Sequence, residues 1–294
     1  MINKLLYDTA FKWHTPYPAP AKLNLMLRIT GQREDGYHLL QTVFQFVTLC
    51  DWLTFIPHGT DDVVLENSLL DVADADNLIL KAAFLLKKET HCPLGAKIRI
   101  EKNLPMGGGI GGGSSDAATT LVVLNHLWQL SLSQQDLMDI GLSLGADIPI
   151  FIFGKTAWAE GVGEKLSQIN VVEQWVLILK PNCHVNTKEI FCASDLTRNS
   201  KSLKIEDFDV RQIRNDCLEV VCKRYEPVKR ALEDLNTFAD ARLTGTGACV
   251  FALFDSEASA RNAQRELGSK WQTYLTKSCN QSPLFLSLIH ISEP

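Results

Sequence analysis

A glycine-rich segment constrains the fold of this chain more than any other part of its sequence. It reads PMGGGIGGGSSDAATT from Pro105 to Thr120, with six glycines among the seven positions 107–113. Glycine loses more backbone freedom on folding than any other residue, so such a run is costly unless positions need positive φ or a ligand approaches the backbone. An alternating segment that predicts a strand precedes the run, and SSDAATTLVVLNHLWQL, which predicts a helix, follows it. The free N–H groups at the start of that helix would favour an anion such as phosphate.

Three interpretations of the run compete. A flexible linker is disfavoured because Ile110 interrupts the glycines and a well-formed helix begins at their end. A dinucleotide-binding loop matches GxGxxG at Gly107, Gly109 and Gly112, but a run of glycines meets that pattern trivially, and no strand ending in Asp or Glu follows at the expected distance. A nucleoside triphosphate loop remains. It is neither a Walker A loop nor a protein-kinase loop, because the chain has no Gly-Lys-Ser/Thr triplet at the end of the run and no HRD or DFG motif.

Composition excludes several other classes of protein. The 294 residues are 46% hydrophobic and 21% charged, as in a globular protein of one or two domains, and the net charge of −5 argues against nucleic acid as the main partner. No apolar run approaches the ~18 residues of a membrane span, and the N-terminus lacks the apolar core of a signal peptide, so we expect no membrane partner and a cytoplasmic location. The eight cysteines form no CxxC pair and the seven histidines no cluster, which predicts free thiols and no structural metal.

Strand-like segments lie on both sides of the glycine run. KLNLMLRIT after Ala21 alternates polar and apolar residues and predicts a strand whose apolar side chains, at positions 23, 25, 27 and 29, share one face. LLQTVFQFVTLCDWLTFIPH predicts two strands separated by a short break, and AKIRIEKNLP predicts a strand that enters the glycine run. The first twenty residues, with prolines at positions 16, 18 and 20, are interpreted as a loosely attached leader.

Helical segments complete an α+β pattern. DNLILKAAFLLKKET predicts a helix with Asp76 as its N-cap. QQDLMDIGLSLG predicts a helix that a capping box of Ser133 and Asp136 opens and that Gly145 closes. The pattern of predicted elements changes near residue 165, where we place a domain boundary. Beyond it, we expect strands in VVEQWVLILKP and LTGTGACVFALF. The final segment FLSLIHISEP lacks periodicity and is expected to be a non-native or disordered tail over residues 285–294.

Four ordered segments resemble the signature motifs of the GHMP kinases, a superfamily of small-molecule kinases. They are PAKLNLMLRITGQREDGYH (residues 20–38), the glycine run, LGADIPIF (residues 144–151) and LTGTGACVFA (residues 243–252). The six-glycine run with its Asp-Ala-Ala continuation resembles most one branch, whose members act on a cytidine diphosphate-linked polyol. The resemblance covers the chain from about residue 20 to residue 284, and four motifs in order are far more specific than any one.

The resemblance implies a two-domain GHMP kinase-like fold with the active site in the interdomain cleft. Residues 1–165 would form the N-terminal ATP-binding domain and residues 166–294 the C-terminal domain. The implied reaction is ATP-dependent phosphorylation of the 2-hydroxyl of a cytidine diphosphate-linked methylerythritol, a step of non-mevalonate isoprenoid precursor biosynthesis. ATP would enter as a co-substrate with Mg²⁺, and the chain would act as a monomer or homodimer.

Lys22 and Asp147 fall on the catalytic positions of that family. Phosphoryl transfer needs a cradle for the triphosphate, positive charge on the migrating group, and a group that orients or deprotonates the attacking hydroxyl. Lys22 would supply the positive charge, and Asp147 would accept the proton or orient the hydroxyl. On the residues alone, a lysine in a strand is more often exposed and an aspartate after a helix is more often a turn residue. The resemblance favours the catalytic interpretation.

The resemblance also implies two sets of binding residues. A cytosine ring would stack on Tyr37 and Phe191 from opposite domains, with His38 at its edge, although on the residues alone Phe191 reads as a core residue and His38 as a loop histidine. The complete substrate set is Asn24, Tyr37, His38, Thr187 and Phe191. The ATP set is Pro105, Met106, Gly107, Gly108, Gly109, Ile110, Gly111, Gly112, Gly113, Ser114 and Ser115, with Asn77 and Lys102 towards the adenine.

Two rival functions stay open on the sequence. The first is another kinase of the superfamily, of the homoserine or mevalonate type, against which GQREDGYH argues because such enzymes need no cytidine pocket. The second is a catalytically silent sugar- or nucleotide-binding protein, against which the presence of both Lys22 and Asp147 argues.

Overall fold

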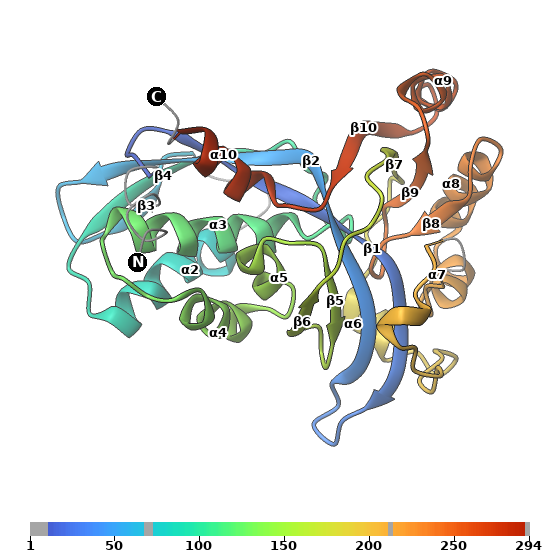
Figure 1. The fold of residues 1–294 in the computed structure, drawn as a ribbon, viewed down its shortest axis with the longest axis horizontal. Coiled ribbons are helices and arrows are strands. Elements are labelled where there is room, and N and C mark those ends of the chain that lie inside the picture. Colours follow the sequence, from blue (N-terminus) through green and yellow to red (C-terminus); the bar gives the residue numbers. More distant parts are fainter. Residues whose placement is uncertain (1–10, 68–72, 211–213, 292–294) are drawn as a thin grey trace.

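Two long antiparallel strands, β1 (Pro16–Gln32) and β2 (His38–His58), run through the molecule and connect its two halves (Figure 1). The computed structural model describes residues 11–67, 73–210 and 214–291. The two strands pair from Pro16 opposite Thr54 to Gln32 opposite His38, and the short turn at residues 33–37 joins them. The first motif (residues 20–38) lies in β1 and the turn after it, and the last motif (residues 243–252) lies in other strands of the same continuous sheet.

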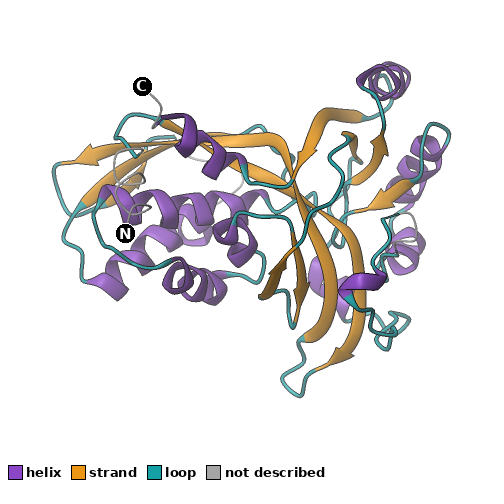
Figure 2. Cartoon of the chain, viewed as in Figure 1, coloured by secondary structure: helices purple, strands orange, loops and turns teal. Residues whose placement is uncertain are grey.

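In the first half, helices lie together on one face of the strands (Figure 2). β4 (Gly95–Glu101) pairs antiparallel with β2 and parallel with β3 (Val63–Leu65), and β5 (Ala157–Glu160) pairs antiparallel with β2 and with β6 (Lys165–Gln168). The helical elements of this half are η1 (Asp74–Asp76), α2 (Leu78–Thr90), α3 (Gly112–Leu127), α4 (Gln134–Leu144) and α5 (Ile148–Phe153).

In the second half, helices pack against four strands that lie in the order β10 (Gln272–Cys279), β7 (Trp175–Lys180), β9 (Val250–Phe254) and β8 (Ala241–Leu243). β10 also pairs with β2. One mixed sheet therefore crosses both halves, with helices against each, and the predicted α+β class is confirmed. The helical elements of this half are α6 (Thr187–Phe191), η2 (Ile205–Asp207), α7 (Leu218–Arg224), α8 (Glu226–Asn236) and α9 (Glu257–Leu267). The last helix, α10 (Pro283–Ile291), follows β10 and packs against the first half.

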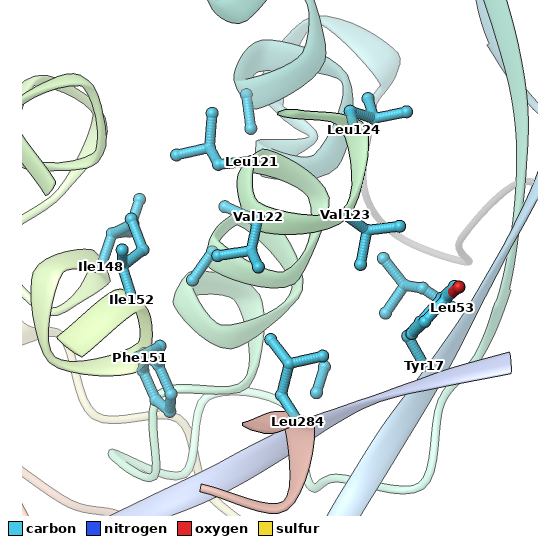
Figure 3. Packing of buried hydrophobic residues seen from close by; sticks show 14 of the residues in the cluster. Tyr17, Leu53, Leu121, Val122, Val123, Leu124, Ile148, Phe151, Ile152 and Leu284 are labelled. Carbon is cyan, nitrogen blue, oxygen red and sulfur yellow. The ribbon is translucent and has the colours of Figure 1, made fainter. Parts of the chain in front are cut away.

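Buried apolar side chains form one core in each half and a third between them. In the first half, α3 presents consecutive apolar residues to α5 and to the strands, because it is buried nearly all round (Figure 3). The central cluster joins Leu23 and Leu25 of β1 to Ile178 of β7 and Phe251 of β9. The two halves are therefore packed together through the sheet rather than linked by a flexible segment.

Irregularities in β1 change which face its side chains occupy. The pairing with β2 shifts register between Asn24 and Met26, so that one extra residue, Leu25, enters the strand. Such a bulge reverses the alternation beyond it. The prediction of one shared apolar face was therefore wrong: Leu23 and Leu25 pack in the central cluster, whereas Leu27 and the residue at position 29 pack in the core of the second half.

The segment before β1 and the start of β1 also differ from the predicted leader. Tyr17 is fully buried and Phe11 lies in the core of the first half, so residues 11–20 belong to the fold, while residues 1–10 lie outside the described part of the chain. The prolines at positions 16, 18 and 20 alternate, and β2 pairs this part of β1 on one side, so their missing N–H donors fall together on the unpaired edge. The predicted break in β2 is also absent, because β1 and then β4 pair along its length.

The helix ends follow the sequence closely, with one shift. Asn77, rather than Asp76, is the N-cap of α2, where its side-chain oxygen accepts from Ile79 N at 2.9 Å. The capping box of Ser133 and Asp136 and the closing Gly145 of α4 are confirmed.

The described part of the predicted tail, residues 285–291, forms a helix on the first half instead of being disordered, and residues 292–294 lie outside the described part of the chain. α10 extends to Ile291, and Leu284 is buried in the core of the first half (Figure 3). Phe285 packs against that core. The contacts that the sequence interpretation missed come from Leu284 and Phe285, whereas Leu286 is exposed. Within the described residues, no helix is long and apolar enough to cross a membrane.

Candidate active site

Two adjoining cavities meet at the glycine loop. The larger, of about 890 Å³, is lined from the first half by β1, β2 and the start of α5, and from the second half by α6 and the loop between β8 and β9. The smaller, of about 410 Å³, is lined by the glycine loop and the start of α2. Gly109, Ser114 and Asp147 line both cavities, so a group bound in one lies next to a group bound in the other.

Close packing explains why several loop positions must be glycine. Gly107, Gly109 and Gly111 have φ values of 64°, 73° and 78°, a region that other residues rarely adopt. A Cβ on Gly109 would lie 2.6 Å from the carbonyl oxygen of Thr244, and one on Gly111 would lie 2.7 Å from Cζ of Phe151. The protein itself fills the space at these two positions. At these two positions, the positive φ and the close packing of the protein therefore account for glycine, rather than the approach of a ligand.

The open side of the loop is the start of α3. Gly111 is the N-cap, and Gly112, Gly113 and Ser114 form the first turn and line the smaller cavity. Backbone N–H groups in this position attract anions because helix dipoles and unpaired donors coincide there. Ser115 is fully buried and lines neither cavity, and its hydroxyl has no hydrogen-bond partner among the described residues. The predicted ligand contact of Ser115 is thus not supported by its position.

Lys22 and Asp147 form an ion pair at the junction of the two cavities. Lys22 is 2% exposed, and its Nζ lies 3.1 Å from Oδ2 of Asp147, whose side chain is 41% exposed. The same ammonium donates to Asn24 Oδ1 at 2.7 Å and to the Gly109 carbonyl at 3.4 Å. It also lies 5.1 Å from the centre of the Phe44 ring. These contacts hold a nearly buried charge in one position, with the carboxylate on its exposed side.

Local structure fixes both partners. Asp147 is the N-cap of α5 but makes no side-chain capping bond, which leaves its carboxylate to Lys22 and to the cavities. The Asn24 amide nitrogen donates to Thr42 Oγ1 at 2.9 Å, so its oxygen faces the ammonium. The Asn24 backbone N–H donates to Thr244 Oγ1 at 3.1 Å, from the loop of the second half.

Lys102 lies in the smaller cavity between two buried carboxylates. Its Nζ donates to Asp116 Oδ2 at 2.8 Å and also to Asp51. Asp51 also accepts backbone N–H bonds from Asn103 at 2.6 Å and Leu104 at 2.8 Å, which hold its carboxylate in place. Burial raises the pKa of Asp116 to about 7, although Lys102 opposes that shift. Burial also disfavours the charge on Lys102, but the two carboxylates outweigh it and raise the pKa of Lys102.

At the far end of the larger cavity, aromatic rings gather from both halves. His38 and Phe191 lie 5.1 Å apart with a 30° angle between their planes, and Arg198 donates to the imidazole. Burial, and next the positive charge of Arg198, lower the pKa of His38. Tyr37 also lines the cavity but is 62% exposed and stacks on no described ring. Thr187 Oγ1 lies 3.0 Å from Thr246 Oγ1.

Most predicted residues thus converge, and the structure adds some that sequence reasoning missed. Lys22, Asn24, Tyr37, His38, Thr187 and Phe191 line the larger cavity with Asp147, whereas Asn77, Lys102 and the residues from Pro105 to Ser114 line the smaller one. The missed lining residues include Thr42 and Phe44, which alternation places on the same face of β2 as His38, and Thr246, which lies in a quoted motif. Arg198 and Lys188 carry no comparable sequence signal. Among the described residues, no group of three or more His, Cys, Asp or Glu side chains is arranged to hold a metal.

Comparisons with known proteins agree with this geometry. The sequence model described as GHMP kinases N terminal domain matches residues 77–155, and the one described as GHMP kinases C terminal matches residues 188–273. Crystal structures of a mevalonate kinase and of the homoserine kinase from Cytophaga hutchinsonii share the fold, with TM-scores of 0.65 and 0.63 over 91% of this chain and 100% and 95% of theirs, at 15% and 14% identity. The chain is therefore a GHMP kinase.

More similar relatives narrow the family. The 4-diphosphocytidyl-2-C-methyl-D-erythritol kinases of Methylococcus capsulatus and Shewanella pealeana are 53% and 51% identical to this chain, over 92% of it and 94% and 96% of their own lengths. A crystal structure of 4-(cytidine 5'-diphospho)-2C-methyl-D-erythritol kinase matches with a TM-score of 0.79 and 27% identity, over 90% of this chain and 99% of that one. The chain belongs to the 4-diphosphocytidyl-2-C-methyl-D-erythritol kinase family.

Proposed function

We propose that this chain transfers the γ-phosphoryl group of ATP to the 2-hydroxyl of 4-diphosphocytidyl-2-C-methyl-D-erythritol, a step of non-mevalonate isoprenoid precursor biosynthesis. The observation that carries the proposal is the position of the Lys22–Asp147 ion pair at the junction of two cavities. A phosphoryl donor in one cavity and an alcohol in the other would meet beside both side chains. Family membership supports this assignment of the two substrates.

ATP would bind in the smaller cavity. Its phosphates would lie against the first turn of α3, where Gly112, Gly113 and Ser114 offer the backbone donors and one hydroxyl. Asn77 and Lys102 also line this cavity and are the residues proposed for the adenine end, although Lys102 lies close to the first turn of α3, where a Cβ on Gly112 would be 3.7 Å from its Nζ. Mg²⁺ would arrive with ATP, and the exposed carboxylate of Asp147 and the Ser114 hydroxyl are hard oxygen donors of the kind it prefers. Bound there, the ion would neutralise charge on the phosphates.

The alcohol substrate would occupy the larger cavity. The rings of His38 and Phe191 give it an apolar end suited to a pyrimidine, with Tyr37 exposed beside them. Lys188 lines the same cavity and pairs with no carboxylate among the described residues, so its charge is available to the diphosphate. Asn24 and Asp147 lie at the opposite end, where the 2-hydroxyl would face the phosphates.

The transfer itself follows from those positions. The substrate oxygen attacks the γ-phosphorus, a new P–O bond forms, and the bond from that phosphorus to the bridging oxygen breaks to release ADP. Asp147 accepts or orients the hydroxyl proton, and Lys22 places a fixed positive charge beside the migrating group. Because Asn24 and Gly109 hold the ammonium, little reorganisation is needed as charge develops.

Lys22 and Asp147 act on one transition state. The double mutant should therefore lose less kcat than the product of the losses in the two single mutants.

We also propose that residues 1–165 form the ATP-binding domain and that residues 166–294 form the second domain. We further propose that the protein works in the cytoplasm. The two family matches, at residues 77–155 and 188–273, fall on either side of the proposed boundary, although α10 packs against the first half. The eight cysteines all lie in the described ranges and are free thiols, which suits a reducing compartment.

An ADP-release assay with candidate alcohols tests the function. The purified chain, ATP and Mg²⁺ are combined in turn with the cytidyl substrate, mevalonate and homoserine. We expect ADP release with the first alone. Release with mevalonate or homoserine instead would assign the chain to another GHMP activity, and release with none while the cytidyl compound binds would favour a silent binding protein.

A further inference from the structure

Arg198 connects two walls of the larger cavity. Its Nε–H donates to His38 Nε2 at 3.1 Å, in the first half of the molecule. Its Nη2 donates to the carbonyls of Phe191 at 2.9 Å and Ala193 at 2.7 Å, and its Nη1 to that of Leu196 at 3.2 Å. One side chain therefore holds both the imidazole and the backbone that carries the facing aromatic ring. No part of the transfer step described above uses Arg198.

The chemistry of the guanidinium determines the state of the imidazole. Arginine remains protonated in proteins and has only donors, so His38 Nε2 must be the acceptor of this hydrogen bond. A neutral histidine that accepts at Nε2 carries its proton on Nδ1. Nδ1 makes no hydrogen bond with another described residue. Two other charged side chains, Asp35 and Lys188, line this cavity, and neither forms a hydrogen bond with the His38 ring. The Asp35 carboxylate pairs instead with Arg33 at 2.7 Å.

We propose that Arg198 is a positioning residue that fixes His38 as the Nδ1–H tautomer, so that the cavity offers the pyrimidine a hydrogen-bond donor and selects cytosine over uracil. The inference rests on the proposed function for the identity of the base. The ring nitrogen N3 of cytosine is an acceptor, whereas N3 of uracil carries a hydrogen. A donor facing uracil N3–H would leave two donors opposed in a partly buried site, which costs about tenfold to a hundredfold in binding.

The tautomer can be measured without any substrate. Nitrogen-15 NMR of histidine-labelled protein distinguishes protonated from unprotonated ring nitrogens. We expect His38 to show a protonated Nδ1 and an unprotonated Nε2 in the wild type, and both tautomers in Arg198→Met. Arg28→Met is the matched control, because Arg28 donates to the Lys201 carbonyl at 2.7 Å and lines neither cavity, so it should keep the wild-type pattern.

An Nε2–H signal for His38 in the wild type, or an unchanged signal in Arg198→Met, would overturn the proposal. The wild-type spectrum alone decides if Arg198→Met does not fold.

Base selectivity is the second readout, and it separates positioning from a purely structural role. Calorimetric titration with CDP and with UDP gives the ratio of the two affinities for each protein. We expect this ratio to fall by about tenfold to a hundredfold in Arg198→Met and to stay unchanged in Arg28→Met. A loss of affinity for both nucleotides to the same extent would assign Arg198 a structural role only. Because the titration needs no turnover, a failure of the proposed kinase activity would not be confused with a failure of this inference.

Discussion

Replacing Gly111 with alanine perturbs the glycine loop at a tightly packed point. Gly111 has a φ of 78°, which costs an L-residue about 1–2 kcal/mol. The new Cβ would lie 2.7 Å from Phe151 Cζ and 3.2 Å from Lys22 Cε, and relieving such overpacking costs about 1–3 kcal/mol. The free energy of unfolding should therefore fall by roughly 2–5 kcal/mol. For a chain of this size that corresponds to a melting temperature lower by roughly 4–10 °C.

The matched control is Gly113→Ala in the same loop. Gly113 has no positive φ, and its new Cβ would lie 3.5 Å from Leu78 Cδ1, an ordinary contact, so its unfolding free energy should change by less than about 1 kcal/mol. Calorimetric melting of the three proteins without nucleotide gives the comparison. Gly111→Ala should also lower kcat, because Phe151 or Lys22 must move. Equal melting temperatures for the two variants would refute the packing argument and would mean that the loop around Gly111 is mobile instead of tightly packed.

Three further predictions address other parts of the molecule. Because burial raises the pKa of Asp116 to about 7, above its value of about 3.9 in the unfolded chain, this group stabilises the fold at low pH and that contribution is lost as pH rises through about 7. The melting temperature of Asp116→Asn relative to wild type should therefore rise from pH 5 to pH 8, and a constant difference would contradict the shift. Phe191→Ala should raise KM for the cytidyl substrate about tenfold to a hundredfold and leave KM for ATP unchanged. A raised KM for ATP with an unchanged KM for the cytidyl substrate would mean that the two substrates are assigned to the wrong cavities. Phe285→Ala should lower unfolding stability by about 1–3 kcal/mol, whereas the exposed Leu286→Ala should not, and equal effects would mean that α10 does not pack as described.

Local patterns allowed much of the fold to be predicted. The glycine run between a strand and a helix, the capping box at Ser133 and the helix end at Gly145 are all set by neighbouring residues, so their positions follow from the sequence. The bulge at Leu25 is different, because it depends on how β1 meets β2 and on the cores on either side. The same limit applies to the prolines of β1, whose tolerance depends on an unpaired edge.

The sequence predicted those site residues that lie within a motif, but not those whose role depends on contacts with residues far away in the chain. Lys22, Asp147 and the glycine loop lie within recognisable motifs. Asp51 and Arg198 act through partners 51 and 160 residues away in the chain, and nothing in their local sequence marks those partners. Ser115 shows the opposite error, since its place in the motif suggested a ligand contact that its burial does not support.

The turnover of Asp147→Asn with the cytidyl substrate tests the proposed mechanism most directly. The substitution keeps the size of the side chain but removes its charge and most of its basicity, next to an ammonium 3.1 Å away. We predict that kcat for ADP release falls at least about a hundredfold, while KM for each substrate changes by less than about threefold. Turnover close to that of the wild type would remove Asp147 from the transfer step, and a wild-type protein that releases no ADP with this substrate would contradict the proposed function itself.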